Sequence, residues 1–264
     1  MKDMPVSYHR ILNRLEARER RLLRDGPSPL SSPMAQLRGH IPPAVHSTLE
    51  AAFTKAFSTL FGPGGTRLVE KTYPKEKLEE AARRWEQPLS PRQARQALRR
   101  MDRQSSLSGN LEGCLVGAEG AALGLLGIGL PDIPILLAWL LRNLYQTAVR
   151  YGFSYESDKE RFYLLLVLQG ALSEGEERRE LSRRADAFGR AIDHGWPVVF
   201  DLEAEVRITA RLLADRLLLV KFIQGLPLVG VLGGAANFSL SGSVSRYGKI
   251  KYKKRFLERK VRGL

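Results

Sequence analysis

The sequence predicts an all-α fold, a single compact multi-helix domain with glycine-rich central helices and a variable helical N-terminal region. In most segments apolar residues recur every three or four positions, as they do on one face of a helix. Ser-x-x-Glu patterns and early prolines mark several helix starts. No segment shows a convincing alternation of apolar and polar residues, which is the pattern of a half-buried strand.

The composition is that of a folded domain with few means of binding a metal. The chain has 264 residues, of which 44% are apolar, enough to bury a large core. Its single cysteine, Cys114, excludes a disulfide scaffold and any multi-cysteine zinc or iron–sulfur site. Four histidines offer little material for a metal enzyme. We therefore expect no cofactor and no metal site.

The N-terminal part, residues 1–105, predicts amphipathic or polar helices separated by Pro- and Gly-rich breaks. These helices cover 5–24, 43–60, 75–86 and 91–102. The first carries six arginines around its apolar stripe. Gly62-Pro-Gly-Gly65 is expected to end the second, and Ser90 is expected to cap the fourth.

Residues 106–264 form the second predicted region, which is more apolar and rich in glycine. Four-residue spacing of glycines, as in Gly113/Gly117 and Gly120/Gly124, lets another backbone approach closely. Asp132 is expected to cap a helix that stops at Gly152. Later helices are expected to open at Ser157-x-x-Glu160 and Ser173-x-x-Glu176, to run over 198–224, and to form the basic tail from Arg246 to Arg262.

The glycine-rich apolar segments do not predict a clean transmembrane span, which needs about 20 mainly apolar residues. Gly120 to Pro131 and Ile133 to Leu141 are shorter than this, and Phe222 to Ser245 is interrupted by glycine, proline and polar residues. Two interpretations stay open. The segments are either buried core helices packed through glycine, or Pro-broken hairpins that dip into a bilayer without crossing it.

No catalytic motif is recognisable, and catalytic residues are unknown at this stage. The chain has no phosphate-binding loop, no G-x-S-x-G elbow and no H-E-x-x-H zinc motif. The candidate polar cluster consists of side chains that interrupt the apolar segments: Asp132, Arg142, Glu160, Lys221 and Asn237. It predicts either a core ion pair that sets helix register or a polar site, with Glu160, Glu119 or Asp215 as the carboxylate for Arg142.

The net charge of +14 is concentrated at the two ends of the chain. Residues 1–110 hold 20 Lys and Arg against 11 Asp and Glu, and residues 246–264 hold nine against one. Three interpretations of a basic tail with interleaved aromatic residues stay open. It binds anionic lipid, it binds nucleic acid, or it is a solvated helix face. The residues proposed for lipid contact are Lys249, Lys251, Lys253, Lys254 and Arg255 at the headgroups, with Tyr252 and Phe256 at the interface.

Several of these motifs, in this order, make the chain similar to the bacterial EcsC protein family over about residues 110–260. They are Leu130-Pro-Asp-Ile-Pro134 after the glycine segment, Leu141-Arg142, Tyr151-Gly-Phe153, Glu160, Lys221, Pro227, Asn237 and the basic aromatic end. Glu119 departs from the small or apolar residue expected in that segment. The resemblance implies a location beside a membrane, with an ABC transporter as a candidate partner. Members of the family have been described as transporter-associated hydrolases, but the resemblance implies no catalytic residue in this chain.

Together these observations predict a membrane-associated or lipid-interacting helical protein. Because the N-terminus lacks the apolar run of a secretory signal, we expect a cytoplasmic location, peripheral to the inner face of the membrane. One alternative is a hydrolase associated with a membrane transporter. Another is a protein or nucleic-acid adaptor that uses the basic tail, although no helix-turn-helix pattern supports nucleic-acid binding.

Overall fold

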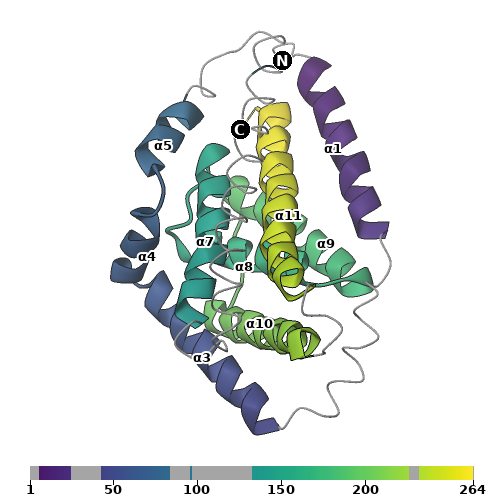
Figure 1. The fold of residues 1–264 in the computed structure, drawn as a ribbon. Helices are drawn as coiled ribbons and strands as arrows, with labels where there is room; N and C mark the ends of the chain where they lie inside the picture. Colours follow the sequence, from purple (N-terminus) through teal and green to yellow (C-terminus); the bar gives the residue numbers. More distant parts are fainter. Residues whose placement is uncertain (1–5, 25–42, 84–95, 97–132, 226–231, 264) are drawn as a thin grey trace.

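The computed structural model describes residues 6–24, 43–83, 96, 133–225 and 232–263 (Figure 1). In that part of the chain every regular element is a helix, which confirms the all-α prediction. The helices are α1 (Val6–Arg24), α3 (Pro43–Phe61), α4 (Pro63–Glu70), α5 (Lys75–Arg83), α7 (Ile133–Arg150), α8 (Asp158–Leu172), α9 (Gly175–Asp193), α10 (Leu202–Gly225) and α11 (Leu232–Arg262). Of the predicted helix 91–102 the structure describes only Gln96, and the glycine segment before Asp132 lies outside the described residues.

Local signals explain most helix boundaries. The Ser157 hydroxyl accepts a hydrogen bond from the Glu160 amide at 3.3 Å, as the capping box predicts. The second box was predicted wrongly. Ser173 ends α8, donating its amide to the Gln169 carbonyl at 2.8 Å, and α9 begins two residues later at Gly175.

Two further elements differ from the expectation. Gly62 ends α3, but Pro63 immediately starts α4, since proline fits the first helical position, where its missing N–H is no loss. The basic tail is not a separate helix, because residues 232–262 run on as one helix, α11.

The central helix of the domain is α8. Its first turn is charged, but from Phe162 to Leu172 it is almost wholly apolar and is buried on all sides. It packs against α9, α10 and α11, and α11 also packs against α7 (Figure 1). The N-terminal helices join the same core, with α1 on α11 and α9, α3 on α10 and α7, and α5 on α7. The division of the chain at residue 105 stays a prediction.

Within the described residues, no helix has an apolar stretch long enough to cross a bilayer. The two interpretations of the glycine-rich segment before Asp132 stay open, since that segment lies outside this part.

One glycine of the α3–α4 corner is required by a close backbone approach. A Cβ on Gly65 would lie 2.1 Å from the Thr59 carbonyl oxygen and 2.5 Å from the Leu60 Cα, both backbone atoms of α3. The neighbouring Gly64 has nothing within 4 Å of its Cβ position.

This contrast predicts opposite effects for two adjacent substitutions. Gly65→Ala should destabilise the protein by about 1–3 kcal/mol, because the backbone of α3 has to move. Gly64→Ala should be neutral or stabilising by about 0.5–1 kcal/mol, because alanine loses less conformational freedom in a helix. Urea unfolding of both variants measures the difference, and equal free energies of unfolding would contradict the close approach.

Candidate functional site

Two members of the predicted polar cluster, Arg142 and Glu160, have described side chains, and these do not contact each other. Glu160 binds Arg255, and Arg142 donates instead to the Thr72 carbonyl at 2.9 Å and lies over the Trp139 ring. Glu160 was one of three carboxylates proposed for Arg142, and this pairing is not formed. Of the other two, Asp215 bonds His46 at 2.9 Å and Glu119 lies outside the described residues. Asp132 and the side chains of Lys221 and Asn237 lie outside the described residues.

Arg255 of α11 is instead the centre of a buried clamp. Its guanidinium donates two hydrogen bonds of 2.7 Å to Glu160 on α8 and two of 2.8 Å to Asp193 on α9. The rings of Phe153 and Tyr163 lie on it, with centroids 4.2 and 4.6 Å from the Cζ atom. Burial acts to lower the pKa of Arg255, but the hydrogen bonds from the two carboxylates outweigh it and raise the pKa.

A second buried network joins α1, α9 and α11. The Lys251 ammonium, with no exposed surface, donates to Glu19 at 2.8 Å, to both Ser182 oxygens at 3.0 Å and to Asp186. Lys254 bonds the same two carboxylates at 2.7 and 2.6 Å. Burial acts to raise the pKa of Glu19, but the two ammonium groups outweigh it and hold the pKa below its ordinary value.

These networks change the expectation for the basic tail. Lys251, Tyr252, Arg255 and Phe256 are at most 5% exposed, and Lys254 is held by two carboxylates. The physical reason is that α11 turns this face toward the acidic side chains of α1, α8 and α9. In this conformation Lys251, Tyr252 and Arg255 lie inside the core, whereas Lys249, Lys253 and Lys254 are half-buried and Phe256 lines the pocket described below. Contact of this segment with headgroups stays a prediction.

The Lys251 network predicts a large loss of stability when one partner is removed. Lys251→Met leaves the buried Glu19 and the half-buried Asp186 with Lys254 as the one cation bonded to both among the described residues, which should cost about 3–5 kcal/mol of unfolding free energy. The matched control is Arg183→Gln, which removes exposed ion pairs with Glu180 and Glu176 and should cost about 0–1 kcal/mol. Denaturant unfolding measures both, and a Lys251→Met cost no larger than the control would contradict the network.

The depressed pKa of Glu19 predicts a pH-dependent difference. Glu19 contributes stability above its ordinary pKa of 4.5, and this contribution is lost as pH falls through the lower folded pKa. Glu19→Gln lacks the charge at every pH. The variant should therefore be less stable than wild type at pH 7, and the gap should shrink below pH 4.5. Thermal unfolding between pH 7 and pH 3 measures the gap, and a gap that widens in acid would contradict this assignment.

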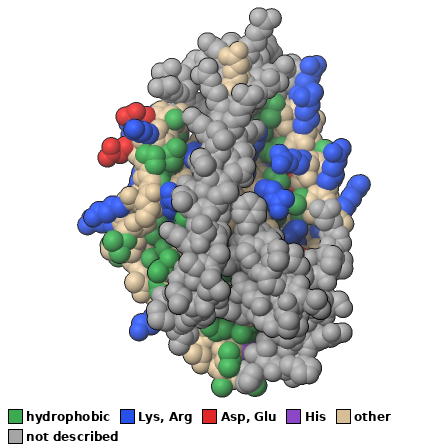
Figure 2. Space-filling view, in the orientation of Figure 1, with side chains coloured by type: hydrophobic (Ala, Val, Ile, Leu, Met, Phe, Trp, Pro, Cys, Tyr) green, Lys and Arg blue, Asp and Glu red, His purple; other side chains and the backbone are tan. Residues whose placement is uncertain are grey.

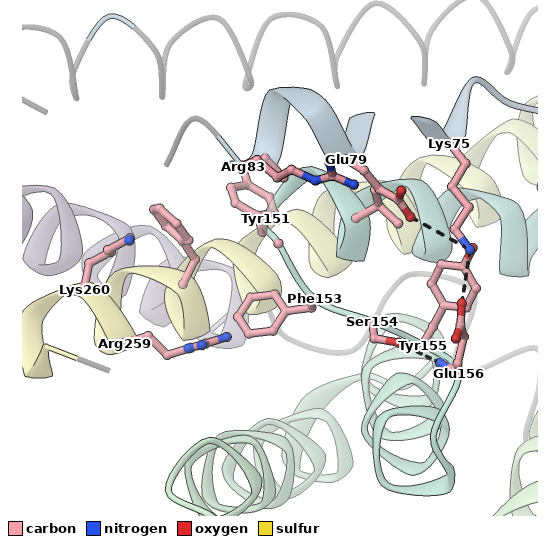
Figure 3. A pocket seen from close by; sticks show the side chains of 14 residues that line it. Lys75, Glu79, Arg83, Tyr151, Phe153, Ser154, Tyr155, Glu156, Arg259 and Lys260 are labelled. Carbon is pink, nitrogen blue, oxygen red and sulfur yellow. Dashed lines mark hydrogen bonds and ion pairs between the residues drawn. The ribbon is translucent and has the colours of Figure 1, made fainter. Parts of the chain in front are cut away.

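A pocket of about 300 Å³ opens between α5, the loop after α7 and the last turns of α11 (Figure 3). Tyr151, Phe153, Tyr155 and Phe256 provide its aromatic walls. Lys75, Glu79 and Glu156 gather at one end, Arg259 and Lys260 lie at the other, and Arg83 lies between them (Figure 3).

The acidic end of this pocket is tightly hydrogen-bonded. Tyr155 donates its hydroxyl to Glu70 at 2.7 Å and pairs with the Tyr73 hydroxyl at 2.6 Å. Lys75 bonds Glu70 at 2.6 Å and Glu156 at 3.1 Å. Burial raises the pKa of the Tyr155 phenol well above its usual range, so this hydroxyl stays protonated at neutral pH. These hydrogen bonds fix the side chains at this end, and the positive charge of Lys75 is already neutralised by carboxylates.

The exposed cations gather on α1 rather than on the tail. Its inner stripe, Tyr8, Leu12, Leu15 and Glu19, is buried, and its arginines project outward. These exposed arginines form the arginine ridge: Arg10, Arg14, Arg18, Arg20, Arg21 and Arg24. Figure 2 shows Lys and Arg side chains along the edge of the molecule where α1 lies. The sequence contains a signal for the arginine ridge, because Arg10 and Arg14 repeat at four-residue spacing opposite the apolar stripe.

Among the described residues, no group of three or more His, Cys, Asp or Glu side chains is arranged to hold a metal ion. The described features are an arginine ridge, two buried charge networks and one polarised pocket. They define a basic all-α protein.

The comparisons place the chain in a family. The model of the EcsC protein family matches residues 9–257, and the chain therefore belongs to this family. A relative is Protein EcsC of Bacillus subtilis (strain 168), 29% identical over 147 residues that make up 54% of this chain and 58% of that protein. The match thus spans less than two thirds of the relative's length. No solved structure matches the chain.

Proposed function

We propose that the protein associates peripherally with anionic membrane surfaces and that the arginine ridge of α1 makes the contact. The observation that carries this proposal is the ridge itself. Six arginines are exposed on one 19-residue helix, and the ion pair found for them within the described residues is Arg20 with Glu16, at 3.8 Å. Anionic lipid attracts such a cluster by about 1 kcal/mol per basic residue near the surface.

The spacing of the ridge makes an anionic partner favourable. Arg10, Arg14 and Arg18 follow one another at intervals of four, and such like-charge neighbours destabilise a helix by a few tenths of a kcal/mol each. A negatively charged surface relieves this repulsion. Because the inner face of α1 is packed against α9 and α11, the contact is made by the outer face and does not require α1 to leave the core.

The cytoplasmic location, the inner face of the membrane and a transporter as partner belong to this proposal. The hydrolase alternative finds less support, because Glu160, one of its expected polar residues, is fully engaged by Arg255 and does not reach Arg142.

Vesicle co-sedimentation tests the ridge. Full-length protein should bind vesicles with 30% phosphatidylglycerol but not pure phosphatidylcholine vesicles, and 0.5 M NaCl should release it. The triple variant Arg10→Gln/Arg14→Gln/Arg21→Gln should lose up to about a hundredfold in partitioning, since three charges supply about 3 kcal/mol. The control Lys55→Gln/Arg207→Gln/Arg211→Gln removes the same charge from exposed positions of α3 and α10 and should bind nearly as wild type.

Equal losses in the two triple variants would mean that net charge, not the ridge, drives binding. Binding that resists salt would instead favour apolar insertion. Tight binding of a DNA or RNA duplex at 150 mM NaCl without vesicle binding would favour the adaptor alternative.

A further inference from the structure

We infer that the pocket between α5, α7 and α11 binds a phosphate ester, with Arg83 and Arg259 holding the phosphate and the aromatic walls holding the organic part. The ligand is either a lipid headgroup or a free ester, because both present the same chemistry. The inference uses none of the arginine ridge and stands apart from the membrane proposal.

The walls of the pocket are fixed by the fold. Tyr151, Phe153 and Phe256 are each at most 5% exposed. Gly152 between the first two has φ +76°, a left-handed conformation that lets the chain reverse after α7. The Phe153 amide then bonds the Ala148 carbonyl at 2.9 Å, and the Arg255 clamp lies on the Phe153 ring. The aromatic surface is therefore preformed.

The charges of the pocket are distributed unequally. At one end Lys75 is within 4 Å of three carboxylates, those of Glu70, Glu79 and Glu156. At the other end, Arg259 contacts the Phe153 ring at 5.4 Å, and no described carboxylate forms an ion pair with it. Arg83 likewise forms no ion pair with a described carboxylate. Within the part of the chain that the structure describes, two guanidinium groups thus line one cavity without an ion-pair partner.

This arrangement selects for a phosphate with an organic substituent. A planar guanidinium binds two phosphate oxygens at once, and two such groups in one pocket match a doubly charged monoester. The aromatic walls suit an aliphatic or planar part, as in most small-molecule sites. The carboxylate oxygens of Glu79 and Glu156 can accept hydrogen bonds from a hydroxyl or ammonium group of the ligand. An ester should therefore bind more tightly than inorganic phosphate.

Isothermal titration calorimetry of the full chain at 150 mM NaCl tests the pocket. The probes are glycerol 3-phosphate, monomeric dihexanoylphosphatidic acid and inorganic phosphate. We expect saturable one-site binding of at least one ester, tighter than that of inorganic phosphate. Arg83→Gln/Arg259→Gln should weaken it by tenfold or more, since each lost charge-assisted hydrogen bond matters. The matched control Arg10→Gln/Arg14→Gln on α1 should leave it unchanged.

The two esters distinguish the source of the ligand. Binding of glycerol 3-phosphate as tight as that of the lipid indicates a free ester, and binding of the lipid alone indicates a headgroup. No ester binding by wild type at millimolar concentration would overturn the inference, as would equal loss in the pocket and control variants. Thermal unfolding confirms that each variant is folded.

Failure here is separable from failure of the membrane proposal. The α1 variants should lose vesicle binding and keep ester binding. A protein that binds vesicles through α1 but no ester would retain the first proposal and lose only this one.

Discussion

The rest of the structure depends on the burial of three cations of α11 against four carboxylates. Lys251 and Lys254 meet Glu19 and Asp186, and Arg255 meets Glu160 and Asp193. Through these contacts one helix is joined to α1, α8 and α9. Buried ion pairs add little net stability compared with apolar packing, but any other register leaves a charge buried without its partner. The networks therefore specify how these helices are aligned.

The same helix links the core to the pocket. Arg255 holds the Phe153 ring from the inside, and Arg259, one turn further along α11, reaches the same ring from the pocket. The basic tail thus contains cations of two kinds. Those neutralised by carboxylates hold the helices together, while Arg259 lines the cavity and forms no ion pair with a carboxylate of the described residues. Composition alone cannot separate the two kinds, because both are arginine or lysine within one helix.

The limits of the sequence prediction follow from the range of the interactions. Helix positions and the Ser157 cap were predictable, since they depend on neighbours within a few residues. The α4 helix was missed because Pro63 stands inside a glycine cluster that otherwise signals a break. The partners of Lys251 are Glu19 and Asp186, which are 232 and 65 residues away, and no local pattern reveals such pairs. For the same reason the sequence could only offer three alternative carboxylates for Arg142, of which Glu160 binds Arg255 instead.

The orientation of α1 shows how the buried network determines the outer surface. Glu19 lies within the apolar stripe of α1 and is bonded to both Lys251 and Lys254, so the rotation of α1 about its axis is set from inside. A helix held by apolar contacts alone could roll without a large electrostatic cost. Here, rolling α1 would bury arginines and leave the two lysines without Glu19. The outward direction of the arginine ridge is therefore a consequence of a carboxylate on the opposite side of the same helix.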